Sequence, residues 1–186
     1  MPEAPLEDSG SGLAPAGDGW FVVNVRDAQW FTSESDEDGA RSSGAECPFE
    51  SRAAEFRQLG IRIHVLEPGE PIGLYHSESK QEDFLVLSGE CTLLVDGQER
   101  KLGPWDFFHC PAETDHIFLG AGDGPCAILM AGARGEEWTV RYPVAELASR
   151  HGAGAKAETT DPDQAYAEWE PSRKARPSYW ACLPWA

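Results

Sequence analysis

The sequence lacks the features of a membrane-spanning or nucleic-acid-binding protein. Apolar residues make up 41% of its 186 residues, but no run approaches the roughly 20 apolar residues that cross a bilayer as a helix. Basic residues are few, 15 against 32 acidic ones, and the formal charge is −17. Nucleic acids and anionic membranes attract basic surfaces, so we expect neither of them as a partner.

Signal-peptide and zinc-finger patterns are missing as well. The N-terminus has no basic start and no apolar stretch of the kind that begins a secretory signal, which favours a cytoplasmic protein. The cysteines are odd in number and scattered without a CxxC pair, so they predict buried free thiols rather than a metal finger. They are Cys47, Cys91, Cys110, Cys126 and Cys182.

The composition divides the chain into a central domain and two extensions. Residues 1–19 are mainly Pro, Gly, Ser, Ala and acidic residues, which predicts a disordered tail. Residues 20–148 predict one β domain, and residues 149–186 a C-terminal extension. The extension ends in the aromatic stretch SYWACLPWA, which would be an exposed apolar patch if it stayed free. We therefore expect it to pack on the domain or on a partner subunit.

An acidic stretch interrupts the N-terminal part of the domain. It reads ESDEDGARSSG over residues 34–44 and predicts a solvated surface connection. The alternative is a cation site formed by Asp36, Glu37 and Asp38, although their spacing is not that of an EF-hand loop.

Short apolar stretches separated by Gly and Pro predict a series of strands. Asp96-Gly97, between two alternating stretches, is the strongest hairpin pattern. No long helix interrupts the series, so we expect an antiparallel sandwich or barrel rather than βαβ units. A short helix is predicted at Val144–His151. The expected strands are Trp20–Val25, Gly60–Leu66, Ile72–His76, Asp83–Leu87, Thr92–Val95, Glu99–Leu102, Asp106–Cys110, His116–Leu119 and Pro125–Ala131.

Four side chains in the middle of the chain are candidate metal ligands. His76 and Glu78 lie two residues apart on a predicted strand and would share one face. Glu82 begins the next strand and can return to the same cavity, whereas His116 must be brought there by the fold. Two imidazoles and a carboxylate leave open positions on a divalent metal. Fe, Mn, Ni and Zn all suit such a set.

Other polar and aromatic residues are candidates for the lining of a pocket. Arg62 and His64 alternate with apolar neighbours and share one face of their strand, which faces either the lumen or water. His109 is placed equally well in a cavity or on the surface, and Tyr75 either walls the pocket or belongs to the core.

The stretch from Ile61 to Ala133 resembles the cupin superfamily. That family has a first motif, G(X)5HXH(X)3,4E(X)6G, and a second, G(X)5PXG(X)2H(X)3N. The residues that match these motifs at the right spacing are His76, Glu82, Gly89, Pro111 and His116. The residues that replace consensus positions are Glu70, Glu78, Trp105, Glu113 and Gly120.

The resemblance implies an all-β fold, an antiparallel double-stranded β-helix of jelly-roll type, with one divalent metal in its lumen. Carried over, the ligands would be His76, Glu78, Glu82 and His116. Alternatively, Glu78 is a general base and only the other three bind metal, or the barrel holds its ligand without metal. The implied function is a metal-dependent dioxygenase, isomerase or decarboxylase of a small organic molecule, or a non-catalytic sensor of one. The family habit and the aromatic C-terminus predict a homodimer.

Overall fold

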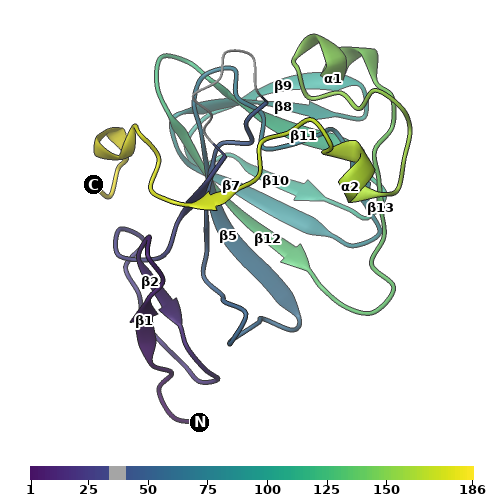
Figure 1. Ribbon diagram of the computed structural model, residues 1–186. Coiled ribbons are helices and arrows are strands. Elements are labelled where there is room, and N and C mark those ends of the chain that lie inside the picture. The colour runs from purple at the N-terminus through teal and green to yellow at the C-terminus, as the bar shows by residue number, and fades with distance from the viewer. Residues whose placement is uncertain (34–40) are drawn as a thin grey trace.

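Two antiparallel sheets form the body of the protein in the computed structural model, which describes residues 1–33 and 41–186 (Figure 1). The candidate cation residues Asp36, Glu37 and Asp38 lie outside this part of the chain. The larger sheet has the strand order β10-β7-β12-β5-β4-β3-β14, and the smaller sheet has the order β11-β8-β9. Each strand pair in both sheets is antiparallel. The expected all-β fold is therefore confirmed.

The strands of the larger sheet are β3 (Phe31–Thr32), β4 (Ala45–Pro48), β5 (Leu59–Leu66), β7 (Glu82–Ser88), β10 (Phe107–Cys110), β12 (Cys126–Ala133) and β14 (Arg173–Lys174). Those of the smaller sheet are β8 (Glu90–Val95), β9 (Gln98–Leu102) and β11 (His116–Ala121). Two short pairs join β1 (Leu6–Asp8) to β2 (Leu13–Pro15) and β6 (Ser77–Glu78) to β13 (Val140–Arg141). The helices are α1 (Glu146–Arg150), α2 (Pro162–Ala165) and the 3-10 turn η1 (Trp180–Cys182). No helix in the described ranges is long and apolar enough to cross a membrane.

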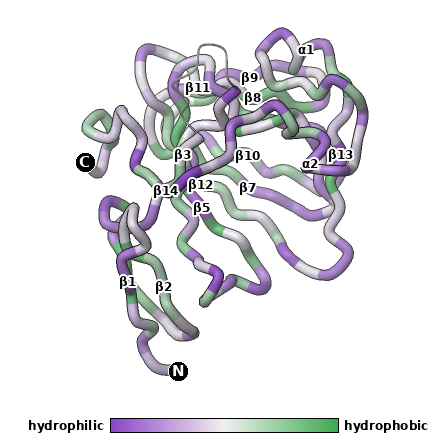
Figure 2. The backbone as a smooth tube through the Cα atoms, viewed as in Figure 1, coloured by the Kyte–Doolittle hydropathy of each residue, from purple (hydrophilic) through white to green (hydrophobic). Residues whose placement is uncertain are grey.

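Both faces of the larger sheet are covered, and the alternation along β5 shows how. Ile63 and Val65 are buried on the outer face with Trp30. Arg62 and His64 point to the opposite face, because successive side chains of a strand alternate. Figure 2 shows hydrophilic and hydrophobic colours succeeding one another along the strands. Ile63 and Val65 thus pack against the segments that cover the outer face of the sheet, while Arg62 and His64 face the interior of the barrel.

An apolar core fills the space between the two sheets. Phe84 and Ile128 from the larger sheet pack in one cluster with Leu93 and Phe118 from the smaller sheet. The rings of Phe84 and Phe118 lie 4.7 Å apart between centroids. Burying such side chains contributes about 1.5–3 kcal/mol each, so this core fixes the sheets on which the functional residues lie.

The hairpin expected at Asp96-Gly97 is confirmed. It joins β8 to β9, with Val95 opposite Gln98, and both turn residues have positive φ, 44° for Asp96 and 72° for Gly97. Positive φ at both positions is what a two-residue hairpin turn of matching twist requires.

Two expected strands are wrong. Trp20–Val25 forms only an isolated bridge at Trp20, and Val22 is 80% exposed. The chain turns at once after it, since Asp27 and Ala28 both donate to the carbonyl of Asn24, so the local β preference finds no partner strand. Residues 72–76 are also irregular. They form no continuous ladder: His76 pairs with His116 only in an isolated bridge, and the N–H of Leu74 donates to Tyr166 Oη at 2.9 Å.

The two chain ends are structured. The region expected as a disordered tail carries the β1–β2 pair, which lies beside the barrel (Figure 1, purple). At the other end, Trp185 stacks on Trp30 with ring centroids 5.5 Å apart, and Leu183 is 6% exposed in the same cluster. The C-terminal aromatic stretch thus covers the outer face of the larger sheet.

Candidate metal centre

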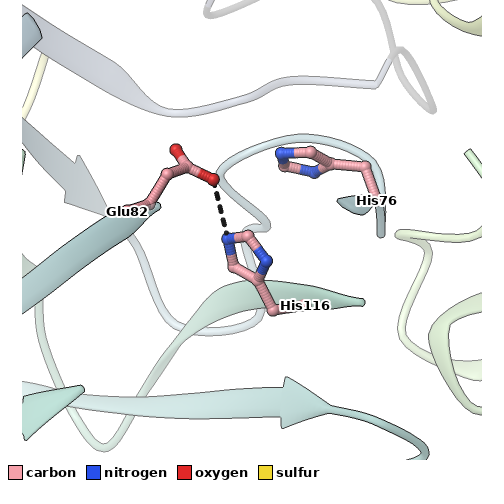
Figure 3. Close-up of side chains that lie close together, drawn as sticks. All are labelled: His76, Glu82 and His116. Atoms are coloured by element: carbon pink, nitrogen blue, oxygen red, sulfur yellow. Dashed lines mark ion pairs between the residues drawn. The ribbon is translucent and has the colours of Figure 1, made fainter. Parts of the chain in front are cut away.

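Three of the four candidate ligands converge beside the cavity described below. His76 directly precedes β6, Glu82 begins β7 and His116 begins β11. One ligand atom from each lies within 4.8 Å of the others. Figure 3 shows the side chains pointing toward one another, with Glu82 Oε2 3.4 Å from His116 Nε2. Residues from three segments therefore meet at one point, which we call the metal trio.

The hydrogen bonds of the two imidazoles fix which nitrogen faces the centre. His76 Nδ1 lies 2.7 Å from the carbonyl of Leu74, and His116 Nδ1 lies 3.0 Å from the carbonyl of Thr114. A carbonyl oxygen can only accept, so each Nδ1 carries the hydrogen. In a neutral ring the lone pair then resides on Nε2, the atom that faces Glu82. This is how outer hydrogen bonds orient metal-binding histidines.

The trio fits a divalent cation. Glu82 is 3% exposed, and its Oε2 has no hydrogen-bond partner in the described part of the chain. That oxygen faces the lone pair of His116 Nε2, and two lone pairs repel unless a proton or a cation lies between them. A buried polar atom without a partner is costly. A divalent metal would satisfy Glu82 and both imidazoles together.

Electrostatics in the absence of a cation point the same way. Burial, followed by the nearby charge of Glu78, raises the pKa of Glu82 to about 8. Burial, followed by the neighbouring His76, lowers the pKa of His116 to about 3. Burial also lowers the pKa of His76. At pH 7 the imidazoles are thus neutral, the state in which they bind metal, whereas Glu82 is protonated without a cation and would release this proton when a metal binds.

Glu78 lies beside the trio but is not grouped with it. Its Oε1 is 3.9 Å from His76 Nε2, while its Oε2 accepts a hydrogen bond from Trp138 Nε1 at 2.7 Å. The indole thus holds one oxygen of the carboxylate, and the other faces the histidine. Trp138 belongs to the connection between β12 and β13, far from the motif, and the sequence contains no pattern that would identify it.

A cavity of about 480 Å³ adjoins the trio, within the usual range for small-molecule sites. Arg62 and His64 line it, as do the apolar side chains of Ile72, Phe84, Phe118 and Met130. Two residues expected as lining lie elsewhere. Tyr75 is buried in the cluster outside the smaller sheet, and His109 is half-exposed and pairs with Asp83 at 2.7 Å.

The C-terminal extension supplies a wall of the cavity that the sequence did not indicate. Tyr166, Trp169, Glu170, Pro171 and Ser172 line the cavity together with Ser43, Gly44 and Glu46. Tyr166 approaches closely because position 73 is glycine: a Cβ there would lie 2.5 Å from its hydroxyl oxygen. The sequence predicts only a C-terminal extension over residues 149–186, so this wall depends on a contact made by the fold.

Comparisons with known proteins find one matching family model and one similar enzyme. Residues 62–132 match the family model described as a cupin domain. The chain is 42% identical over 50 residues to the quercetin 2,3-dioxygenase of Bacillus subtilis, a match that covers 27% of this chain and 15% of that enzyme.

Two solved structures are also similar. One, from Silicibacter pomeroyi, is described as a sugar phosphate isomerase of a cupin superfamily; it is 28% identical with a TM-score of 0.49, covering 55% of this chain and 66% of the other. The other is a polyketide cyclase from Streptomyces resistomycificus, 16% identical with a TM-score of 0.51, covering 62% of this chain and 80% of the other. The second similarity concerns the fold alone.

Proposed function

We propose that this protein, whose residues 62–132 match the family model of a cupin domain, is a metal-dependent dioxygenase that acts on a small organic molecule held in the barrel. The observation that carries the proposal is the metal trio, two neutral imidazoles and a buried carboxylate within 4.8 Å of one another. Such a set leaves positions open for substrate and O₂. The local identity with a quercetin dioxygenase supports the choice of reaction.

The residues around the cavity would have three roles: metal binding, exclusion of water and proton transfer. His76, Glu82 and His116 would hold the metal, which when bound brings substrate and O₂ together and mediates electron transfer between them. The buried phenylalanines and Met130 would exclude water around the substrate. Glu78 Oε1, which faces His76, would accept a proton from the substrate, while the indole of Trp138 keeps the carboxylate in place. If both oxygen atoms enter the substrate and the substrate supplies all four electrons that O₂ accepts, no external reductant is consumed.

The position of Glu78 favours a second candidate, an isomerase. A carboxylate beside a metal can remove a proton from a bound substrate and return it to another atom. Trp138→Phe would release one oxygen of this base without touching the trio. The isomerase would consume no O₂, whereas the dioxygenase would consume it in step with the loss of substrate.

Elemental analysis of protein purified without added metal tests the metal centre. We expect about one equivalent in the wild type and less than about 0.2 in His76→Gln. His109→Gln, in a half-exposed histidine that pairs with Asp83, is the matched control and should keep its metal. Oxygen uptake by the iron-reconstituted protein with quercetin then tests the reaction. A wild type that binds no metal after reconstitution overturns the proposal, and metal without turnover would favour a non-catalytic sensor.

A further inference from the structure

His64 is a buried polar residue that lines the cavity, and one of its ring nitrogens is unsatisfied. The residue is 6% exposed, and its Nε2 has no hydrogen-bond partner within the described ranges. Burial lowers the pKa of His64 to about 4, so its ring is neutral at pH 7. A buried polar atom without a partner costs about 1–3 kcal/mol. A ligand in the cavity that hydrogen-bonds to this nitrogen would remove the cost.

The register of the sheet places His64 away from the metal trio. On β12, Gly132 lies opposite both Glu82 and Gly60, whereas Ile128 lies opposite His64. His64 is therefore four residues along β5 from the row that contains Glu82, about 13 Å at the usual rise per residue. Both residues line the same cavity, so a single ligand can contact both.

The charges of the cavity disfavour an anion. Glu46, Glu78, Glu82 and Glu170 all line it. Arg62, the only cationic side chain among the described lining residues apart from the histidines, is already paired with Glu46 at 2.8 Å. With a divalent metal on the trio, Glu78, Glu82 and Glu170 still leave one net negative charge, so a carboxylate or phosphate on the part of the ligand away from the metal would be repelled. Apolar side chains line much of the rest, among them Ile72, Phe84, Phe118 and Met130, and the other polar groups there are uncharged.

We propose that His64 and the metal trio bind two ends of one ligand, an uncharged, hydroxylated ring compound. A hydroxyl suits His64 because it can donate to or accept from Nε2, whichever tautomer the ring adopts. The apolar side chains between the two ends would pack on the ring. This inference rests on the proposed function for the metal end, and it adds a second polar contact that discriminates among ligands.

Two probes on the zinc-loaded protein separate the ends. Quercetin is uncharged at mildly acidic pH and carries hydroxyls around its rings. 3-Hydroxyflavone has the same ring skeleton and keeps the chelating hydroxyketone, but it lacks the other hydroxyls. We expect His64→Phe to weaken quercetin binding about tenfold, the effect of one buried hydrogen bond, and to leave 3-hydroxyflavone binding unchanged. His64→Gln, which keeps a polar group, should restore most of the affinity, and His109→Gln should change neither.

The charge requirement has its own probe. A sulfonated quercetin should bind at least about tenfold more weakly than quercetin, because it brings a negative charge into an acidic cavity. Equal or tighter binding of the sulfonate would overturn the assignment of an uncharged ligand.

The remaining outcomes also decide the matter. If His64→Phe weakens both flavonoids equally, or neither, His64 is not a ligand-binding residue. If neither flavonoid binds the wild type, the ring-compound assignment fails. Metal content, measured on every sample, reports separately on the metal trio, so a failure there is distinguished from a failure at His64. Should His64→Phe not fold, the comparison of His64→Gln with a His64→Leu variant on the same probes replaces it.

Discussion

The backbone N–H of His76 donates to the carbonyl of His116 at 3.2 Å, and the N–H of His116 donates to the carbonyl of His76 at 2.8 Å. Two residues that exchange both bonds form an antiparallel pair whose side chains lie on one face. The two rings accordingly lie with centroids 5.0 Å apart. Backbone pairing, rather than side-chain packing alone, therefore brings together two ligands that are forty positions apart in the chain.

Metal should stabilise the folded protein through this site. Because the trio exists only in the folded state, zinc at about 100 times its dissociation constant should add about 2.7 kcal/mol to the free energy of unfolding. Glu82→Gln keeps the shape of the side chain but removes its charge, so the added stability should largely disappear. Urea unfolding with and without zinc measures both. Equal stabilisation of the wild type and Glu82→Gln would contradict the assignment of Glu82 as a ligand.

The contact of Gly73 with Tyr166 should control the C-terminal wall. In Gly73→Ala the new Cβ would lie 2.5 Å from the hydroxyl oxygen of Tyr166, displacing the ring and breaking its hydrogen bond with Leu74. We expect a loss of about 1–3 kcal/mol from the unbonded amide. In a Tyr166→Phe background the hydroxyl is already gone, so the same alanine should cost less. Unfolding free energies of the four proteins form the cycle, and strict additivity would show that the two residues are not coupled.

The aromatic C-terminus should contribute to global stability. Leu183 is 6% exposed in the cluster around Trp30, so Leu183→Ala should cost about 2–3 kcal/mol by leaving a cavity. Trp105 is 73% exposed, and Trp105→Ala serves as the control with a change within about 0.5 kcal/mol. Denaturant midpoints compare the two variants. A Leu183 variant as stable as the wild type would mean that the segment does not pack on the sheet in solution.

His64 should make stability depend on pH. Its pKa falls from 6.5 to about 4 on folding, with burial as the main cause. Between these values the unfolded chain binds a proton that the folded protein does not, so the contribution of His64 to stability declines as pH falls from 7 to 4. The loss should be about 3 kcal/mol. The glutamine in His64→Gln does not titrate. Between pH 7 and pH 4 the wild type should therefore lose about 3 kcal/mol of stability relative to this variant. Unfolding free energies of both proteins, measured without metal at several pH values in this range, test the prediction. A constant difference between the two proteins would show that His64 is not buried as a neutral ring.

Local patterns were reliable where a physical requirement acts over a few residues. The two positive φ values of the Asp96-Gly97 turn follow from the side chains at those positions, and the hairpin is where the pattern predicts it. The sequence did not predict which side chains of β10 face the core. Phe107 and Phe108 are adjacent and equally apolar, yet Phe107 is 63% exposed and Phe108 packs against the core. His109 shares the outward face of Phe107, which alternation alone could not decide.

The sequence by itself determined an acidic, mostly β protein with a resemblance to cupins over residues 61–133, and it placed two imidazoles and a carboxylate at spacings that suit a metal, because strand periodicity and turn chemistry are local. Only the tertiary structure decided that Glu78 is held by Trp138 rather than grouped with the trio, and that the C-terminal extension walls the cavity. It also decided that His64 lies inside while His109 lies outside. These outcomes depend on contacts between residues far apart in the sequence. Local patterns of neighbouring residues do not determine which of these contacts form.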